Sequence, residues 1–410
     1  MNNTPELLSP AGDLDKMRFG IAYGADAVYM AGTRFGMRAA ATNFDDNALR
    51  EGIAYAHAHG VKCYITVNIM PSNRDLPALP AYLELLQDAG ADALIIADVG
   101  VLRMARRYAP KVPVHISTQT SILNHEAANY WADEGAERIV LARELSLEEI
   151  AEIRAKTPKE LEIEAFVHGA MCISYSGRCL ISQYMTGRDA NHGACAQPCR
   201  WNYSLMEEKR PGQFFPVEED GRGTYLYNSK DMCMIEHVPE LIKAGITSFK
   251  IEGRNKTAYY AACVTGAYRA AIDTYKKDPE NFVLPQFCRD EVNKVSHREY
   301  YTGFYFGNQE NGQHYGDSQY IREYEVVGMP VECDDSGKAV FALKNRFFDG
   351  EELELIQPGQ APYVFRAENV TDDEGTKREL FNVPQMRVHF SFPFSVDEYA
   401  ILRKKKERPS

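Results

Sequence analysis

A recurring phrase, made of an amphipathic stretch, a glycine and a short apolar run, constrains the fold of the N-terminal part of the chain more than any other feature. A glycine in this place predicts a helix that ends in the left-handed conformation, with a buried strand a few residues later. The apolar runs are rich in Val, Ile and Tyr, which is typical of parallel strands covered on both faces. The five copies are AYGADAVYMAG (22–32), HAHGVKCYITVN (57–68), DAGADALIIAD (88–98), DEGAERIVLAR (133–143) and KAGITSFKIEG (243–253), with Gly24, Gly60, Gly90, Gly135 and Gly245 as the stop residues.

Three further apolar runs, ELLSP (6–10), VPVHISTQ (112–119) and LEIEAFVHG (161–169), raise the number of predicted strands to eight. Eight strands alternating with helices predict a TIM-like (β/α)8 barrel over residues 1–278. A doubly wound open sheet is the alternative, but no glycine-rich dinucleotide motif follows the first strand. The helical patterns between the strands include 45–59, 78–89, 124–134 and 147–156, the last opened by a capping box of Ser146 and Glu149.

The character of the sequence changes after the barrel. Residues 279–319 form an irregular, aromatic connector, and residues 320–410 alternate apolar and polar positions between turn signals. This alternation predicts a small all-β domain, either a barrel or a sandwich. It ends in a basic run that we interpret as a solubilising tail or as an RNA contact, comprising Arg403, Lys404, Lys405, Lys406 and Arg408.

Composition narrows the class of protein. Hydrophobic residues make up 45% of the chain and charged residues 25%, as in ordinary globular proteins. We see no signal peptide and no apolar run of about 18 residues, so we expect a cytoplasmic protein without a membrane partner. The net charge of −12 argues against coating nucleic acid through the overall field, although a local basic patch could still hold RNA.

Four of the nine cysteines fall in one segment with the spacing C-x6-C-x15-C-x3-C, at Cys172, Cys179, Cys195 and Cys199. The segment, residues 168–230, follows the seventh predicted strand and is therefore inserted at the catalytic rim of the barrel. In a reducing compartment, clustered cysteines bind metal more often than they form disulfides. Zinc sites usually pair cysteines as C-x2–4-C twice, so the spacing favours an iron–sulfur site and leaves zinc as the alternative. We interpret the other five as small buried hydrophobes: Cys63, Cys233, Cys263, Cys288 and Cys333.

The stretch EAFVHGAMCISYSGRCLIS (164–182) resembles the signature of the collagenase-like peptidase family of unknown catalytic type, peptidase family U-32. That signature reads E-x-F-x-x-G-[small]-[apolar]-C-x4-G-x-C-x-x-S, and every fixed position is present. The likeness extends to ELLSPAG, GADAVY, ISTQ, LARELSLEEI, GACAQPCRW and KIEGR, and to the C-terminal β domain.

The resemblance implies a function. Several members of this family are oxygen-independent hydroxylation proteins that carry a [4Fe-4S] cluster. The chain is most similar to the transfer RNA branch, which forms 5-hydroxyuridine at the anticodon wobble position using prephenate. The implied partners are tRNA, prephenate and another copy or a related family member, because members sometimes work in pairs. The implied cluster ligands are Cys172, Cys179, Cys195 and Cys199, with Cys233 as a rival for the fourth place.

Polar residues at the ends of the predicted barrel strands are the candidate site residues. We expect Arg38 and Arg254 to bind the two carboxylates of prephenate, although each could instead form an ion pair at the rim. His168 is the candidate for proton transfer, with a structurally satisfied histidine as the alternative. The predicted catalytic residues are His168 and Glu252, and the predicted substrate-binding residues are Arg34, Arg38, Asn68, Gln119, Glu144 and Arg254.

Two interpretations of the aromatic stretch 297–307 stay open: its rings stack unpaired bases, or they pack the barrel against the β domain. Two alternatives to a hydroxylase also stay open. A peptidase lacks support because neither H-E-x-x-H nor G-x-S-x-G occurs. The other alternative is a nonenzymatic, cluster-bearing adaptor that delivers electrons or RNA within a hydroxylation complex.

Overall fold

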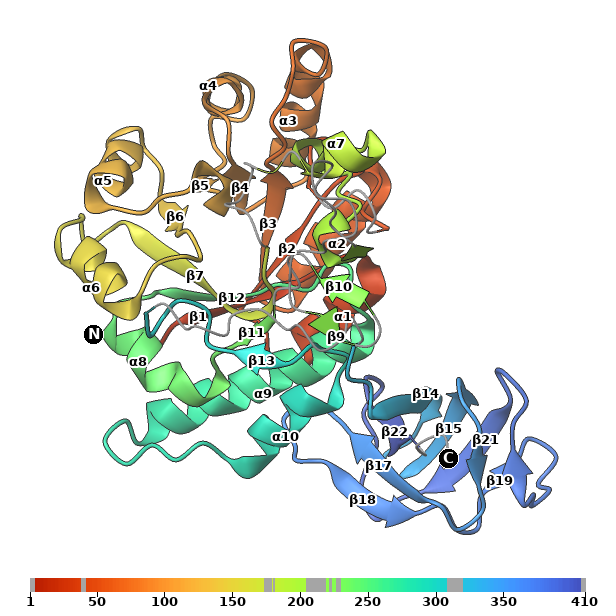
Figure 1. Ribbon diagram of the computed structural model, residues 1–410. Coiled ribbons are helices and arrows are strands. Elements are labelled where there is room, and N and C mark those ends of the chain that lie inside the picture. The colour runs from red at the N-terminus through yellow and green to blue at the C-terminus, as the bar shows by residue number, and fades with distance from the viewer. Residues whose placement is uncertain are drawn as a thin grey trace, which may run out of the picture.

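The computed structural model describes residues 4–37, 42–172, 179, 181–203, 219–220, 223–225, 230–307 and 320–406. A closed barrel of eight parallel strands forms its N-terminal part, and a separate antiparallel β domain follows (Figure 1). Closure is shown by the last barrel strand, which pairs in parallel with both the first and the seventh. An open doubly wound sheet is therefore excluded. The barrel strands are β1 (Glu6–Pro10), β2 (Ala27–Met30), β3 (Lys62–Val67), β4 (Ala93–Ile96), β5 (Val114–Ile116), β6 (Arg138–Val140), β7 (Glu162–Ala170) and β12 (Ser248–Ile251).

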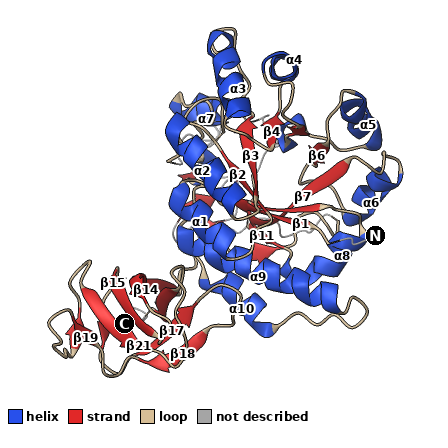
Figure 2. Cartoon of the chain, turned by 180° about the vertical axis from the view of Figure 1, so that it is seen from behind, coloured by secondary structure: helices blue, strands red, loops and turns tan. Residues whose placement is uncertain are grey.

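Helices surround the barrel on its outer face (Figure 2). All five predicted stop glycines have positive φ, between 71° and 96°, and Ser146 with Glu149 forms the predicted capping box. Within the described part of the chain, no helix is long and apolar enough to cross a membrane. The helices are α1 (Leu14–Ala22), α2 (Asp46–Ala58), α3 (Leu79–Asp88), α4 (Val99–Tyr108), α5 (His125–Asp133), α6 (Leu147–Ala155), α8 (Val238–Lys243) and α9 (Ala258–Lys277).

A network of buried charged side chains lies in the barrel interior. Glu164 on β7 is fully buried and accepts hydrogen bonds from Arg138 Nη1 at 3.1 Å and Lys250 Nζ at 2.6 Å. Arg138 also donates to Glu6 at 2.6 Å. Burial alone would raise the pKa of Glu6, but Arg138 and the Tyr64 hydroxyl hold it below its ordinary value. These side chains come from β1, β3, β6, β7 and β12, so the network ties both sides of the barrel closure together.

The segment between β7 and β12 extends the barrel sheet. β11 (Asp231–Cys233) pairs antiparallel with the end of β7, and β13 (Tyr300–Tyr301) pairs with β11. The predicted connector is therefore not wholly irregular: it contains α10 (Gln286–Lys294) and β13. The inserted segment also contains α7 (Ile181–Thr186), the short 3-10 turns Ala190–His192 and Pro198–Arg200, and the strands β8 (Asn202–Tyr203), β9 (Glu219–Asp220) and β10 (Gly223–Tyr225).

The C-terminal domain is all-β, as expected, and its strands pair antiparallel. Seven strands pair in the order β18-β17-β22-β14-β15-β21-β19, and β16 pairs with β20. Both sheets contribute to one aromatic core, in which Phe347 and Phe381 stack with ring centroids 4.8 Å apart. The strands are β14 (Tyr324–Cys333), β15 (Lys338–Leu343), β16 (Phe347–Phe348), β17 (Glu352–Ile356), β18 (Tyr363–Arg366), β19 (Thr371–Asp372), β20 (Leu380–Phe381), β21 (Arg387–Ser391) and β22 (Ile401–Lys405).

Most of the predicted basic tail is strand β22. Arg403 is fully buried and donates to Glu291 of α10 and to Glu354 of β17, at 2.6 Å and 2.8 Å. Neither the solubilising nor the RNA-contacting interpretation fits this side chain, because it joins the β domain to the barrel. Lys406 is exposed, and Arg408 lies outside the described residues.

Removing the charge at Glu164 is expected to destabilise the barrel strongly. The Glu164→Gln variant leaves Lys250 and Arg138 in the interior without their shared carboxylate, which typically costs about 3–5 kcal/mol. Urea unfolding measures this loss. Glu152→Gln, which breaks an exposed ion pair with Lys156 on α6, serves as the control and should leave the midpoint unchanged. Coincident unfolding curves for Glu164→Gln and the wild type would contradict this account of the network.

Candidate functional site

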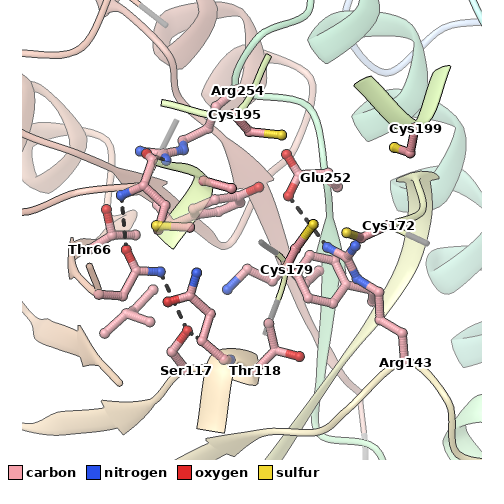
Figure 3. A pocket seen from close by; sticks show the side chains of 18 of the residues that line it. Thr66, Ser117, Thr118, Arg143, Cys172, Cys179, Cys195, Cys199, Glu252 and Arg254 are labelled. Carbon is pink, nitrogen blue, oxygen red and sulfur yellow. Dashed lines mark hydrogen bonds and ion pairs between the residues drawn. The ribbon is translucent and has the colours of Figure 1, made fainter. Parts of the chain in front are cut away.

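A pocket opens at the carboxyl ends of the barrel strands, where active sites of this architecture lie (Figure 3). Its floor includes Lys250 of β12 and Tyr29 of β2, and the Lys250 ammonium lies 4.5 Å from the centre of the Tyr29 ring. Its wall is formed by strand ends and by the inserted segment. The lining residues used below are Thr66, Asn68, Gln119, Arg143, Glu252 and Arg254, together with Cys172, Cys179, Cys195 and Cys199.

The structure brings all four predicted cysteine ligands to this one pocket. Cys172 follows β7 directly, and Cys199 lies in the turn Pro198–Arg200. Ser182, the last fixed residue of the signature, is fully buried, and its hydroxyl accepts a hydrogen bond from Ala196 N at 3.0 Å. This bond fastens the loop beside Cys195 to α7. The signature residues 173–178 and 180 lie outside the described part of the chain.

The donor chemistry fits the metal group that the sequence resemblance implies. Four thiols are the usual ligands of iron–sulfur clusters and of structural zinc. Among the described residues, no three His, Cys, Asp or Glu side chains are close enough together to coordinate one metal ion. The thiols thus share a pocket without forming a coordination sphere, and the ligand set stays a prediction.

Cys199 and Cys233, the rivals for the fourth ligand position, lie in different surroundings. Cys199 lines the pocket, whereas Cys233 is on β11 opposite His168 and is not among the described lining residues. Burial raises the pKa of the Cys233 thiol to about 12. The position of Cys199 makes it the better candidate. Of the other cysteines, Cys63, Cys263 and Cys288 are buried as expected, but Cys333 is exposed.

Three of the predicted substrate-binding residues reach the pocket: Asn68, Gln119 and Arg254. Asn68 is fixed by two hydrogen bonds, accepting from Met37 N at 3.1 Å and donating to Ser117 Oγ at 3.4 Å. Arg254 is buried and donates to the Met37 carbonyl. Gln119 Oε1 and Thr66 Oγ1 are buried and have no hydrogen-bond partner among the described residues. These two oxygens give the pocket polar groups that a bound ligand can satisfy.

Two cations of the pocket were missed from the sequence. Arg143 lies over the ring of Phe166 at 3.9 Å and 3.6 Å from the Glu252 carboxylate. It ends the apolar run IVLAR, one residue before the predicted Glu144, so the strand-end position was the available signal. Lys250 lies inside the predicted strand run FKIEG, and it was missed because only residues at or after the strand ends were taken as candidates.

His168 does not reach the pocket. In the parallel pairing of β12 with β7, Lys250 lies opposite Phe166, and the next residue, Ile251, lies opposite His168. One residue of β7, Val167, therefore has no partner on β12 and forms a bulge. This bulge breaks the alternation that would point His168 inward. Its ring lies instead against tyrosines of α9 and β13, with Tyr300 Oη 3.3 Å from Nε2. The position does not support a catalytic role and agrees with the structurally satisfied alternative.

Two other predicted residues, Arg34 and Glu144, are not among the described lining residues of the pocket. Arg34 is exposed and forms an ion pair with Asp46 at 3.1 Å. Glu144 is half-buried, and burial raises the pKa of its carboxyl. Arg38 lies outside the described residues. A position after a barrel strand is therefore not sufficient to bring a side chain to the described lining of this pocket.

The aromatic stretch packs against the barrel. Tyr305 is buried, and its hydroxyl donates to the Phe166 carbonyl at 2.6 Å. The Tyr300 hydroxyl donates to Val292 O at 2.7 Å, and its ring stacks on His297 at 4.1 Å. These contacts support the packing interpretation over base stacking, although the partners are β7 and α10 rather than the β domain.

The backbone geometry explains why the signature has a glycine at position 169. Its φ is 109°, and a Cβ at this position would lie 2.3 Å from the Glu252 carbonyl oxygen. Only glycine permits both the backbone conformation and this close approach. The signature therefore keeps the chain that leads to Cys172 tight against the strand end that carries Glu252.

Comparison with known proteins adds the family to this geometry. The sequence matches "Peptidase family U32" over residues 12–315 and "Peptidase family U32 C-terminal domain" over residues 322–403. This chain belongs to peptidase family U32. A U32 peptidase of known structure, Mk0906, matches 60% of this chain and 92% of its own length, with 15% identity and a TM-score of 0.38.

Curated relatives in this family match almost the whole chain. The tRNA hydroxylation protein P1 of Bacillus subtilis (strain 168) is 38% identical over 98% of this chain and 95% of its own length. The tRNA hydroxylation protein P of Escherichia coli (strain K12) is 38% identical over 90% of each chain. The 23S rRNA 5-hydroxycytidine C2501 synthase of Escherichia coli (strain K12) is 40% identical over 80% of this chain but only 48% of its own length.

The buried position of His168 predicts a pH effect on stability. Burial, with the nearby His297 and Lys256, lowers the pKa of His168 to about 3, so the unfolded chain binds the proton first as pH falls below about 6.5. Stability is therefore lost between these two values. His168→Gln should lose about 1 kcal/mol less unfolding free energy than the wild type between pH 7 and 5.5. Urea titrations at both pH values measure this, with the exposed His59→Gln variant as control. Equal losses in wild type and His168→Gln would rule out the buried neutral imidazole.

Proposed function

We propose that this chain is a tRNA-modifying enzyme that hydroxylates the uridine at the anticodon wobble position to 5-hydroxyuridine without molecular oxygen. One observation carries the proposal: the four clustered cysteines, two arginines and a lysine line the same pocket at the barrel rim. The relatives that match nearly the whole chain are named tRNA hydroxylation proteins, which supports the same substrate here.

We assign a [4Fe-4S] cluster to the four thiolates of Cys172, Cys179, Cys195 and Cys199, with zinc as the alternative metal. A cluster held at these positions supplies electron transfer beside the substrate. The chain's own residues shape the remainder of the pocket. The amide groups of Asn68 and Gln119 and the hydroxyl of Thr66 provide hydrogen-bonding groups for the edges of a pyrimidine.

We assign prephenate, a dicarboxylate, to the cationic side of the pocket. Arg143 and Arg254 can each bind a carboxylate through two parallel hydrogen bonds, and Lys250 adds a point charge at the floor. Arg143 replaces Arg38 in this assignment because Arg143 is a described lining residue. The Glu252 carboxylate lies 3.6 Å from the Arg143 guanidinium, close enough to help hold it at the pocket wall.

The peptidase alternative lacks a histidine base among the described lining residues of the pocket. No histidine is among the lining residues that the structure describes, so none of the four thiols has an imidazole there to act as its base. The thiols that a cysteine peptidase would need are the same ones assigned to the cluster.

Loss of any one pocket cysteine is expected to remove the cluster. Anaerobically purified wild-type protein should contain about four irons and four sulfides, and the alanine variants of Cys172, Cys179, Cys195 and Cys199 should fall well below this. Cys233→Ser is the matched control and should retain iron and sulfide. Iron and sulfide assays, together with the visible absorption spectrum, measure the cluster content of the wild type, the alanine variants and the control. A colourless wild-type protein with one bound zinc would refute the cluster, and iron loss only in the Cys233 variant would refute this ligand set.

The function itself is tested by nucleoside mass spectrometry of tRNA from a strain lacking the gene. Derivatives of 5-hydroxyuridine should be absent and should return when the wild-type gene is restored. Arg143→Ala should lower them at least about tenfold, because a charge-assisted contact to a carboxylate is lost. Arg34→Ala, outside the pocket, should restore the wild-type level. An unchanged nucleoside profile in the deletion strain would refute the proposed function.

A further inference from the structure

A groove of about 680 Å³ lies between the barrel rim and the C-terminal β domain. Its barrel side is formed by the segment after β12 and the start of α9, and its other side by the segment around β14. Cys172, Cys195, Cys199 and Glu252 line both this groove and the pocket. The groove is therefore continuous with the pocket, on the side where the thiols lie.

The groove carries an excess of positive charge, in contrast to the net charge of −12 of the whole chain. Arg322, Lys344 and Lys406 are exposed. Lys256 is held at the barrel side, where its ammonium donates to Ser296 O at 2.9 Å and lies 4.0 Å from Asp231. The acidic side chains in the described lining are Glu252 and Glu325. The described lining of the groove thus carries more cationic than acidic side chains and complements a polyanion.

Aromatic rings accompany these charges. The ring of Tyr320 is surrounded by Lys256 at 4.4 Å, Arg298 at 4.6 Å and Arg322 at 5.5 Å. Tyr324 lines the groove nearby. Cations gathered around aromatic side chains are the surface that single-stranded nucleic acids use, because phosphates bind the cations while bases lie on the rings.

We propose that this groove binds the unpaired RNA nucleotides that flank the nucleotide held in the pocket, with Arg322, Lys344 and Lys406 contacting phosphates. The inference rests on the proposed function, since it takes the pocket as the place where one nucleotide is modified. Continuity favours RNA over an acidic peptide: a chain of nucleotides entering the pocket must leave along a neighbouring surface, and this groove shares the pocket's cysteine wall.

The test is binding of a fluorescent anticodon stem-loop RNA with an unmodified wobble uridine, measured anaerobically by anisotropy on the full chain. The Lys344→Glu/Lys406→Glu variant should bind at least about tenfold more weakly than the wild type, and the slope of log affinity against log salt should fall by about two. Lys405→Glu is the matched control, because its side chain is 67% exposed and lies outside the described lining of the groove. It should bind within about twofold of the wild type, and all three proteins should show the same melting temperature and iron content.

Equal affinity of the wild type and the double variant would overturn the proposal. A wild-type protein that binds polyglutamate but not this RNA would also overturn it, in favour of an acidic peptide. The assay involves no turnover, so it separates this inference from the proposed function. Groove-dependent RNA binding in a protein that leaves tRNA nucleosides unchanged would support the groove while refuting hydroxylation.

Discussion

The carboxylate of Glu164 lies in the closed barrel between two buried cations, Arg138 on one side and Lys250 on the other. Burying a carboxylate costs desolvation free energy, and both cations are needed to compensate for that cost. Here the partners come from strands on either side of the point where the barrel closes. Lys250 also lies at the floor of the pocket. The ion pair that links the strands where the barrel closes therefore also fixes the position of the ammonium group at the floor of the site.

The path of the chain after Glu164 determines where the candidate site residues lie. One extra residue in β7 turns His168 outward, and Gly169 then approaches the Glu252 backbone so closely that no side chain fits. The next residues deliver Cys172 to the rim, and Ser182 holds the loop of Cys195 near it. The fixed residues Gly169 and Ser182 of the signature thus help to position the backbone that carries the thiols at the barrel rim.

The fold could be predicted in detail, because the glycine stops and the apolar runs are local signals that barrel closure does not override. The position of the four clustered cysteines at the barrel rim could also be predicted, because they are close together in the sequence and follow the seventh predicted strand. His168 could not be placed, because a bulge cannot be distinguished from regular alternation in one sequence. Lys250 was missed and Arg403 was interpreted as part of a tail for a common reason. Each charge lies in a strand, and the buried partners, Glu164 of Lys250 and Glu291 of Arg403, are distant in sequence.

The central claim is that the wobble nucleotide enters the pocket that the four cysteines line. Photocrosslinking tests it most directly: an anticodon stem-loop with 4-thiouridine at the wobble position is bound anaerobically, irradiated, and the linked peptides are identified by mass spectrometry. The account predicts links to peptides that carry Asn68, Gln119 or Phe166, all of which line the pocket. Links confined to the helical outer face of the barrel or to the far strands β18 and β19 would contradict it.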